Sequence, residues 1–241
     1  MNLALLASAL GALALLLLAA AGPLYRIGLL ALPNAFVLLR WGAYGGAAAA
    51  AAALIACVVA YRRRARARLL LSVVALIGGL AAVTIPYQWQ RAARNTPPIH
   101  DITTDLEKPP TFDAVTRLRT DASNSLERPP ILADQQRKGY PDLAPITLPI
   151  PPADAFDRAL AAAQQAGWIM VTADKSSGRI EATDTTRWFG FKDDIVVRLT
   201  PWGSGTRVDL RSASRVGTGD TGTNARRIRK YLDSLKSQTV D

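Results

Sequence analysis

The stretch from Arg211 to Ile228, RSASRVGTGDTGTNARRI, holds the densest mixture of arginine, hydroxyl and glycine residues in this chain of 241 residues. Gly217, Gly219 and Gly222 precede an amphipathic segment, so backbone N–H groups can turn toward one point ahead of a helix start. Such a point attracts a phosphate or carboxylate. We therefore take as a candidate anion site the set Arg211, Ser212, Ser214, Arg215, Gly217, Asp220, Gly222, Asn224 and Arg227.

The same stretch also fits a structural role. Asp220 could cap the last helix and pair with Arg215 or Arg227, and the glycines would then serve only the turn. No Lys-Ser/Thr pair follows the glycines, so the stretch is not a Walker loop. Both interpretations predict that the turn directly precedes a helix.

Secondary candidates are His100, Asp101, Thr103, Thr104 and Asp105, together with the adjacent pair Asp193 and Asp194. Adjacent residues of a strand point to opposite faces, so that pair alone cannot chelate a metal. With one histidine and one cysteine in the chain we expect no zinc site, although calcium bound by oxygen ligands stays open. We predict no catalytic residue and no cofactor.

The first ninety residues are mostly apolar, and all 19 acidic residues lie from Asp101 onward. Three apolar runs, 3–21, 41–61 and 69–87, are each long enough to cross a membrane, which gives a membrane domain over 1–90. The first run could be a signal peptide, but no basic residue precedes it, so we expect a retained helix. The segment 22–40 contains two prolines and predicts an interfacial or re-entrant connection.

The segment RRRARAR, residues 62–68, places five arginines between the second and third runs, which is a strong cytoplasmic marker. The amino terminus is then cytoplasmic, and the part after the third run lies in the periplasm of a bacterium, outside the inner membrane. The seven arginines of the membrane part account for most of the net charge of +10, so nucleic acid is not an expected partner. The expected partner is the lipid bilayer. Gly42 and Gly46 face either the chain's own helices or another membrane protein.

The soluble part divides into an arm and a folded core. Residues 91–151 are rich in proline, which predicts an extended arm with a short helix near 132–138. Residues 152–241 predict an α+β domain with a four-stranded antiparallel sheet (168–173, 179–186, 195–201 and 206–212) and two helices on one face (152–167 and 223–236). One register of the last two strands sets Arg198 opposite Asp209.

Several motifs occur in an order that resembles the domain of unknown function 1499 family: HDITTD at 100–105, WFGFKDD at 188–194, RSASRVG at 211–217 and DTGTNARRI at 220–228. The resemblance covers about Pro98 to Leu235. It implies a fold unit but no established activity. The three preceding apolar runs resemble a common bacterial arrangement of that family.

These observations predict an inner-membrane protein whose periplasmic domain binds or scaffolds an anionic group or a lipid. One alternative is an accessory subunit of a larger membrane complex, docked through the small-residue helix. Another is an uncharacterised hydrolase that uses an aspartate or His100.

Overall fold

The computed structural model describes residues 2–120 and 122–237, which fall into two compact units. The first unit runs to Ala92 and also includes residues 187–190. The second unit begins at Ala93 and contains the rest of the described chain. The units are described separately below.

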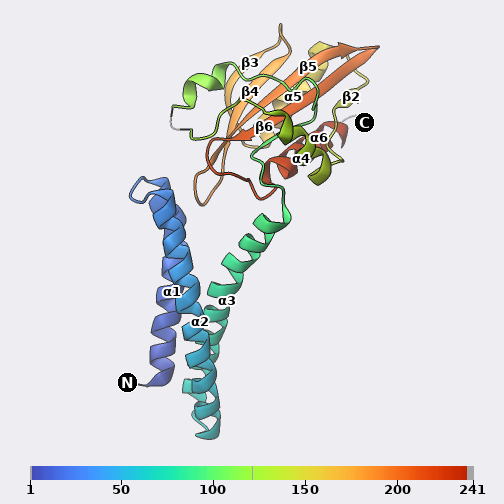
Figure 1. The fold of residues 1–241 in the computed structure, drawn as a ribbon. Helices are drawn as coiled ribbons and strands as arrows, with labels where there is room; N and C mark the ends of the chain where they lie inside the picture. The colour runs from blue at the N-terminus through green and yellow to red at the C-terminus, as the bar shows by residue number, and fades with distance from the viewer. Residues whose placement is uncertain (1, 121, 238–241) are drawn as a thin grey trace. The chain divides into compact units, whose positions relative to one another are not determined.

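Three long helices form the first unit: α1 (Leu3–Arg26), α2 (Leu32–Arg62) and α3 (Arg66–Asn95) (Figure 1). All three are long and apolar enough to span a membrane. They extend beyond the predicted runs, and the connection expected at 22–40 is mostly helical. Pro23 lies inside the last turns of α1, and Pro33 lies in the first turn of α2, where its missing N–H leaves no helical bond unmade.

The small residues of α2 pack against the other helices of the first unit. A Cβ on Gly42 would lie 2.9 Å from the side chain of Leu18 on α1. A Cβ on Gly46 would lie 2.6 Å from Ala82 Cβ and 2.9 Å from the Gly79 carbonyl oxygen, both on α3. The interpretation that this face packs against the chain's own helices is therefore confirmed.

The second unit is built on a sheet of six strands with the order β1-β6-β5-β4-β3, and β2 also pairs with β6. All pairings are antiparallel. The strands are β1 (Asp101–Thr103), β2 (Ile146–Leu148), β3 (Ile169–Asp174), β4 (Arg179–Thr185), β5 (Lys192–Trp202) and β6 (Gly205–Ser214).

The prediction of four strands was too low, because the arm supplies β1 and β2. Each has three residues and lies between prolines, so neither shows the alternating pattern that identifies a strand in a sequence. Both pair along the same edge of β6: β1 with residues 211–213 and β2 with residues 206–208. The arm thus covers an edge that would otherwise be exposed.

One face of the sheet is covered by α5 (Pro152–Gln165) and α6 (Thr223–Ser237), as the sequence predicted. Their apolar stripes and the alternate residues of β4, β5 and β6 form the main core, which includes Phe156, Ile180, Ile195, Leu210 and Ile228. The rings of Trp168 and Tyr231 stack at 4.8 Å within it.

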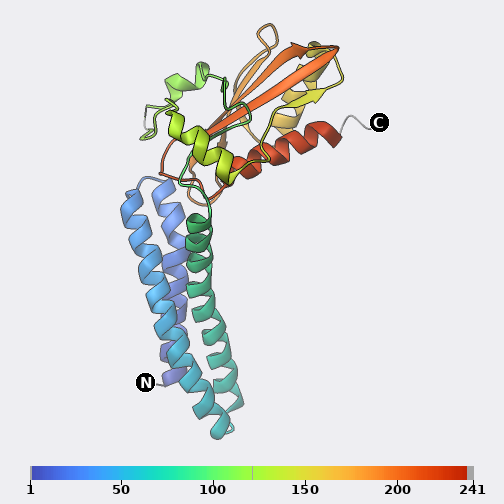
Figure 2. The same ribbon diagram turned by 45° about the vertical axis from the view of Figure 1, so that its right-hand side comes forward.

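The arm contains α4 (Pro130–Gly139), close to the predicted short helix, and a 3-10 helix, η1 (Ala114–Leu118). Figure 2 shows its green segments running beside the sheet. The sheet residues that contact this part of the chain are mostly charged, and they include Glu181, Asp194, Arg211 and Arg215. The sheet therefore has an apolar face toward the helices and a charged face toward the arm.

Candidate functional site

The alternation of side chains along β6 divides the candidate residues between the two faces of the sheet. Arg211 and Arg215 point toward the arm, where they contact Pro110 and Leu118. Ser212 and Ser214 point toward α6 and bond Asn224. Because consecutive strand residues face opposite ways, these residues do not form one site.

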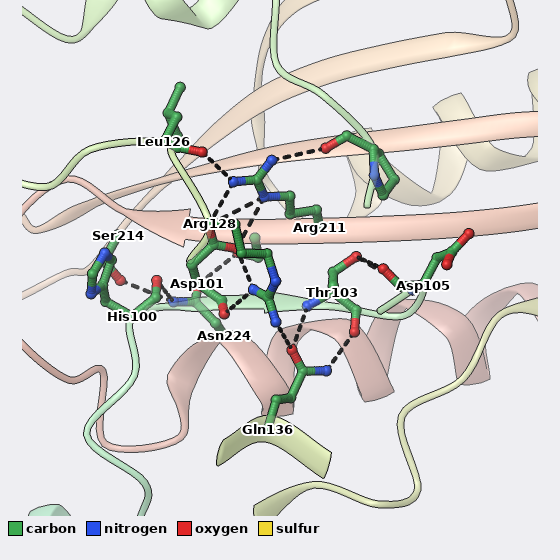
Figure 3. A network of polar contacts seen from close by, with 12 residues as sticks. His100, Asp101, Thr103, Asp105, Leu126, Arg128, Gln136, Arg211, Ser214 and Asn224 are labelled. Carbon is green, nitrogen blue, oxygen red and sulfur yellow. Dashed lines mark hydrogen bonds and ion pairs between the residues drawn. The ribbon is translucent and has the colours of Figure 1, made fainter. Parts of the chain in front are cut away.

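Arg211 forms a two-pronged ion pair with Asp101 on β1 (Figure 3). Arg211 Nη2 donates to Asp101 Oδ2 at 2.7 Å, and Nε donates to Oδ1 at 3.0 Å. Arg128 of the arm donates to the same carboxylate at 3.0 Å. All three side chains are buried, and burial lowers the pKa of Arg128, an effect that Asp101 opposes and Arg211 reinforces.

The remaining donors of Arg211 hold the backbone of the arm. Nη1 donates to the carbonyl of Pro110 at 3.1 Å, and Nη2 donates to the carbonyl of Leu126 at 2.7 Å. The guanidinium also lies 5.0 Å from the centre of the Phe112 ring. A segment rich in proline has more carbonyl acceptors than N–H donors, and arginine offers donors only. Arg211 therefore supplies hydrogen-bond donors that the arm itself lacks.

The free edge of β1 is closed by side chains. Gln136 on α4 accepts from Thr103 N at 3.1 Å and donates to the Thr103 carbonyl at 2.5 Å, so its amide takes the place of a neighbouring strand (Figure 3). Thr104 Oγ1 accepts from Leu210 N at 2.9 Å, and Thr104 N donates to the Leu210 carbonyl. Gln136 thus closes the outer edge of β1 at Thr103, and Thr104 fastens the end of β1 to β6.

Asp194 is the second buried carboxylate on the arm face. It accepts from Arg215 at 2.9 and 3.0 Å, from Arg119 of the arm at 2.5 Å and from Thr183 Oγ1 at 2.8 Å. Arg215 also donates to the carbonyl of Leu118 at 2.6 Å. One carboxylate between two guanidiniums again joins the sheet to the arm.

On the opposite face, Arg227 of α6 pairs with two aspartates of the sheet. Its Nη2 donates to Asp193 Oδ2 at 2.6 Å, and its Nε donates to Asp184 Oδ2 at 2.9 Å. Burial alone would lower the pKa of Arg227, but the two carboxylates outweigh it and raise the pKa. Nη1 donates to Asn224 Oδ1 and to Ser212 Oγ. The side chains of Asp193 and Asp194 point to opposite faces of the sheet, as predicted.

A fourth cluster of charged side chains surrounds Asp105. Arg198 and Arg207 each donate to Asp105 Oδ2, at 3.0 and 2.9 Å, and both also contact Asp209. The predicted register of Arg198 opposite Asp209 is confirmed. Burial opposes ionisation of Asp105, but the backbone N–H groups of residues 107 and 108 and then the two arginines outweigh it, so its pKa is lowered.

The glycine-rich turn precedes α6, and Asp220 caps that helix. Its carboxylate accepts from Gly222 N at 2.9 Å and from Asn224 N at 2.5 Å. Gly217, Thr221 and Gly222 have positive φ values of 91°, 53° and 77°. The built-in carboxylate already uses N–H groups that a bound anion would need, and burial raises the pKa of Asp220.

Two further side chains lie at this turn. Burial is the largest effect on His100 and lowers its pKa, although Asp101 and a hydrogen bond with the Thr218 backbone favour the charged form. The hydroxyl of Tyr140 is buried and is one of three such side-chain atoms without a hydrogen-bond partner among the described residues. Burial also raises the pKa of Tyr140.

Tyr140 and Arg226 converge beside Gly222. A Cβ on Gly222 would lie 3.4 Å from the Tyr140 hydroxyl and 3.2 Å from Arg226 Nη1. Arg226 is held there by donating to the carbonyl of Thr221 and to Thr223 Oγ1, and it forms no ion pair within the described part of the chain. Neither residue was among the predicted candidates, because neither stands in a recognisable spacing with the glycines.

The side chains proposed for metal binding or nucleophilic chemistry can be placed in the structure. Within residues 2–120 and 122–237, no group of three or more histidine, cysteine, aspartate or glutamate side chains could hold a metal ion. The hydroxyls of Ser212 and Ser214 bond Asn224, and only the backbone carbonyl of His100 reaches that cluster.

The sequence did not reveal the residues that complete these networks, among them Arg119, Arg128, Gln136, Asp184 and Glu181. Glu181 accepts from the backbone N–H groups of Asp113 and Val115 at 2.8 and 2.9 Å. Each of these partners comes from a distant segment, so no local motif marks it.

No curated protein matches this chain. A family model described as "Protein of unknown function (DUF1499)" matches residues 101–235, which contain the ion-paired arginines, the glycine-rich turn and most of α6. This match covers more than half of the chain, and the chain therefore belongs to the DUF1499 family, preceded here by three helices that could span a membrane.

Proposed function

We propose that this protein is a membrane-anchored binding module, and that its soluble domain takes up a ligand with an anionic group at the turn before α6. The observation that carries the proposal is the buried hydroxyl of Tyr140, which has no hydrogen-bond partner among residues 2–120 and 122–237 and lies beside Gly222 and Arg226. An unmade hydrogen bond in a buried place costs free energy, and a ligand acceptor would supply the missing partner.

The other candidate arginines are less suited to a ligand. Arg211, Arg215 and Arg227 are each buried and paired with aspartate, so an anion would have to displace a carboxylate. Arg226 carries an exposed guanidinium that two oxygen atoms already orient. A phosphate or carboxylate oxygen can accept from Arg226 and from Tyr140 together. Asp220 lies near the same place, and burial favours its neutral form.

Binding fits this site better than catalysis. A general base must be ionised and within reach of a substrate proton, whereas burial raises the pKa of Asp220, and its carboxylate already accepts from Gly222 N in the turn and from Asn224 N in α6. The alternative of an accessory subunit relied on Gly42 and Gly46 as a docking face, and these glycines contact α1 and α3 of the same chain. The proposed role is therefore recognition by the soluble domain at a membrane.

The orientation of the helices is part of this proposal. Five arginines lie between the last residue of α2 and the first turn of α3, and arginine is enriched on the cytoplasmic side of membrane proteins. The soluble domain would then lie in the periplasm of a bacterium. A reporter enzyme that is active only outside the cytoplasm, fused after residue 241, should be active. Activity of a cytoplasmic reporter at the same position would contradict this orientation.

The binding test uses the full chain in a non-ionic detergent. Inorganic phosphate, sn-glycerol 3-phosphate and small carboxylates are titrated while thermal unfolding is followed. A ligand that binds the folded state raises the unfolding temperature with concentration. Tyr140→Phe should leave the stability of the unliganded protein unchanged or increased, since it removes a hydroxyl without a partner, and should weaken binding about tenfold.

Tyr231→Phe is the matched control, because the Tyr231 hydroxyl donates to the Ala159 carbonyl at 2.8 Å in the core. That change should lower stability and leave binding unaffected. Arg226→Ala should weaken binding, while Arg137→Ala on α4 should not. Equal binding by wild type and Tyr140→Phe, or no stabilisation by any of these anions, would reject the proposed site.

A further inference from the structure

A cavity lies at the end of the first unit where α1 begins and where α2 turns into α3. Figure 2 shows the amino terminus and the α2–α3 turn at the same end of the three helices. The cavity has a volume of about 290 Å³ and is lined by all three helices, with Asn2 from the start of α1, Ala56 and Val59 from α2, and Arg63 and Arg68 from the turn and the start of α3.

The two arginines of the cavity have no possible carboxylate partner in their own unit. Every aspartate and glutamate of the chain lies at or beyond Asp101, and residues 187–190 contain none. An arginine that lines a cavity between helices gains most from a planar, negatively charged acceptor that it can contact with two N–H groups. The counter-charge must come from outside this unit.

The position of the cavity along the helices indicates which molecule supplies the negative charge. The shortest of the three helices of this unit, α1, has 24 residues and is therefore about 36 Å long, which exceeds the hydrocarbon thickness of about 30 Å. The helix ends then lie at the depth of the lipid headgroups. Basic cavities between membrane helices at this depth suit phosphate-bearing headgroups.

The apolar residues that line the cavity suit the acyl chains of a lipid. Ala56, Val59 and Ala60 present small apolar surfaces on α2, and Leu3 and Ala4 do so on α1. Exposed apolar side chains continue along the helices from this end, including Leu5 and Ile55. A molecule with a charged head and apolar tails can therefore contact the arginines and the outer surface of the helices at once.

We infer that this cavity binds the headgroup phosphate of an anionic phospholipid, with Arg63 and Arg68 as its charged partners and the acyl chains along α1 and α2. This site lies in the first unit, so it does not depend on the site proposed in the soluble domain. Its failure would leave that proposal unaffected.

The test uses the full chain, purified in a non-ionic detergent and titrated with phosphatidylglycerol, phosphatidylcholine or sn-glycerol 3-phosphate. Native mass spectrometry counts bound lipid, and thermal unfolding follows stabilisation. Phosphatidylglycerol should bind at least about tenfold more tightly than phosphatidylcholine. The double variant Arg63→Gln/Arg68→Gln should lose this preference.

The double variant Arg62→Gln/Arg64→Gln is the matched control, because it removes the same charge from the same turn without touching the cavity. It should retain the preference for phosphatidylglycerol. If the two double variants lose it equally, general attraction to the arginine cluster explains the binding and the site is rejected. Binding of sn-glycerol 3-phosphate as tight as that of the lipid would also overturn the lipid assignment.

Discussion

Arg211 and Asp101 are separated by 110 positions in the sequence, yet their side chains form a buried ion pair with N–O distances of 2.7 and 3.0 Å. The pair joins β6 to β1, the first element of the arm. Together with Asp194 and Arg215 it explains why a segment so rich in proline lies ordered against the sheet. The arginines that first suggested an anion site hold the chain's own carboxylates and carbonyls.

Arg211→Ala should destabilise the second unit strongly. Removing Arg211 leaves the buried Asp101 carboxylate with Arg128 as its remaining arginine partner and takes a donor from the carbonyls of Pro110 and Leu126. Breaking a buried pair in this way costs about 3–5 kcal/mol. Urea denaturation of the full chain in detergent, followed by near-ultraviolet circular dichroism, measures the change. Arg229→Ala is the control, because Arg229 and Asp142 form a largely exposed pair, and its loss should cost less than about 1 kcal/mol. Similar effects of the two changes would contradict the role given to Arg211.

Asp220 should make the protein less stable as the pH rises. Its pKa is raised by burial, so its contribution to stability is fully present below its ordinary value of 3.8 and is lost as the pH rises through the higher value of the folded state. The stability of the wild type relative to Asp220→Asn should therefore be greater near pH 3.5 than at pH 7. Asp233→Asn, at an exposed position on α6, serves as the comparison. If the difference in stability between the wild type and Asp220→Asn did not change with pH, the Asp220 carboxyl would not be desolvated.

His100 is the chain's only histidine, so its imidazole can be followed without ambiguity. Burial lowers its pKa from 6.5, and the carbon-13 resonance of the ring in the full chain should titrate with a midpoint below that value. The stability that the neutral ring contributes is present above pH 6.5 and is lost as the pH falls through the lower pKa of the folded state. A midpoint at or above 6.5 would show that burial is not the dominant effect on the ring.

Gly46→Ala should weaken the packing of the three helices, whereas Gly45→Ala should have little effect. A Cβ at Gly46 would lie 2.6 Å from Ala82 Cβ, but one at Gly45 would lie no closer than 3.5 Å to Ala14. Forcing an extra methyl group into close packing costs about 1–3 kcal/mol. Thermal unfolding of the two variants in the same detergent compares neighbouring positions of one helix. Equal unfolding temperatures would mean that α2 and α3 do not pack closely at Gly46.

Local patterns predicted much of the second unit. Periodic apolar residues identified α5 and α6, alternation identified β3 to β6, and matching the apolar faces of β5 and β6 gave the register that pairs Arg198 with Asp209. These features depend on neighbours within a few residues or across one hairpin. The strands β1 and β2 were missed, because three residues between prolines become strands only through the edge of β6.

The structural role of the turn was predicted correctly, whereas the anion site stays a prediction. The glycine-rich turn does precede α6, and Asp220 does cap that helix. The unpartnered hydroxyl of Tyr140 could not be predicted, because burial without a partner is a property of the folded environment and not of the residue type.

The sequence alone determined that three apolar segments precede an α+β domain, since hydrophobicity and its period are properties of consecutive residues. It also determined that the arginines near the start of the chain have no acidic neighbour. Only the tertiary structure decided which carboxylate each later arginine meets. Charge pairs such as Arg211 with Asp101 and Arg227 with Asp193 form between distant segments, and their geometry exists only once the arm, the sheet and α6 are packed together.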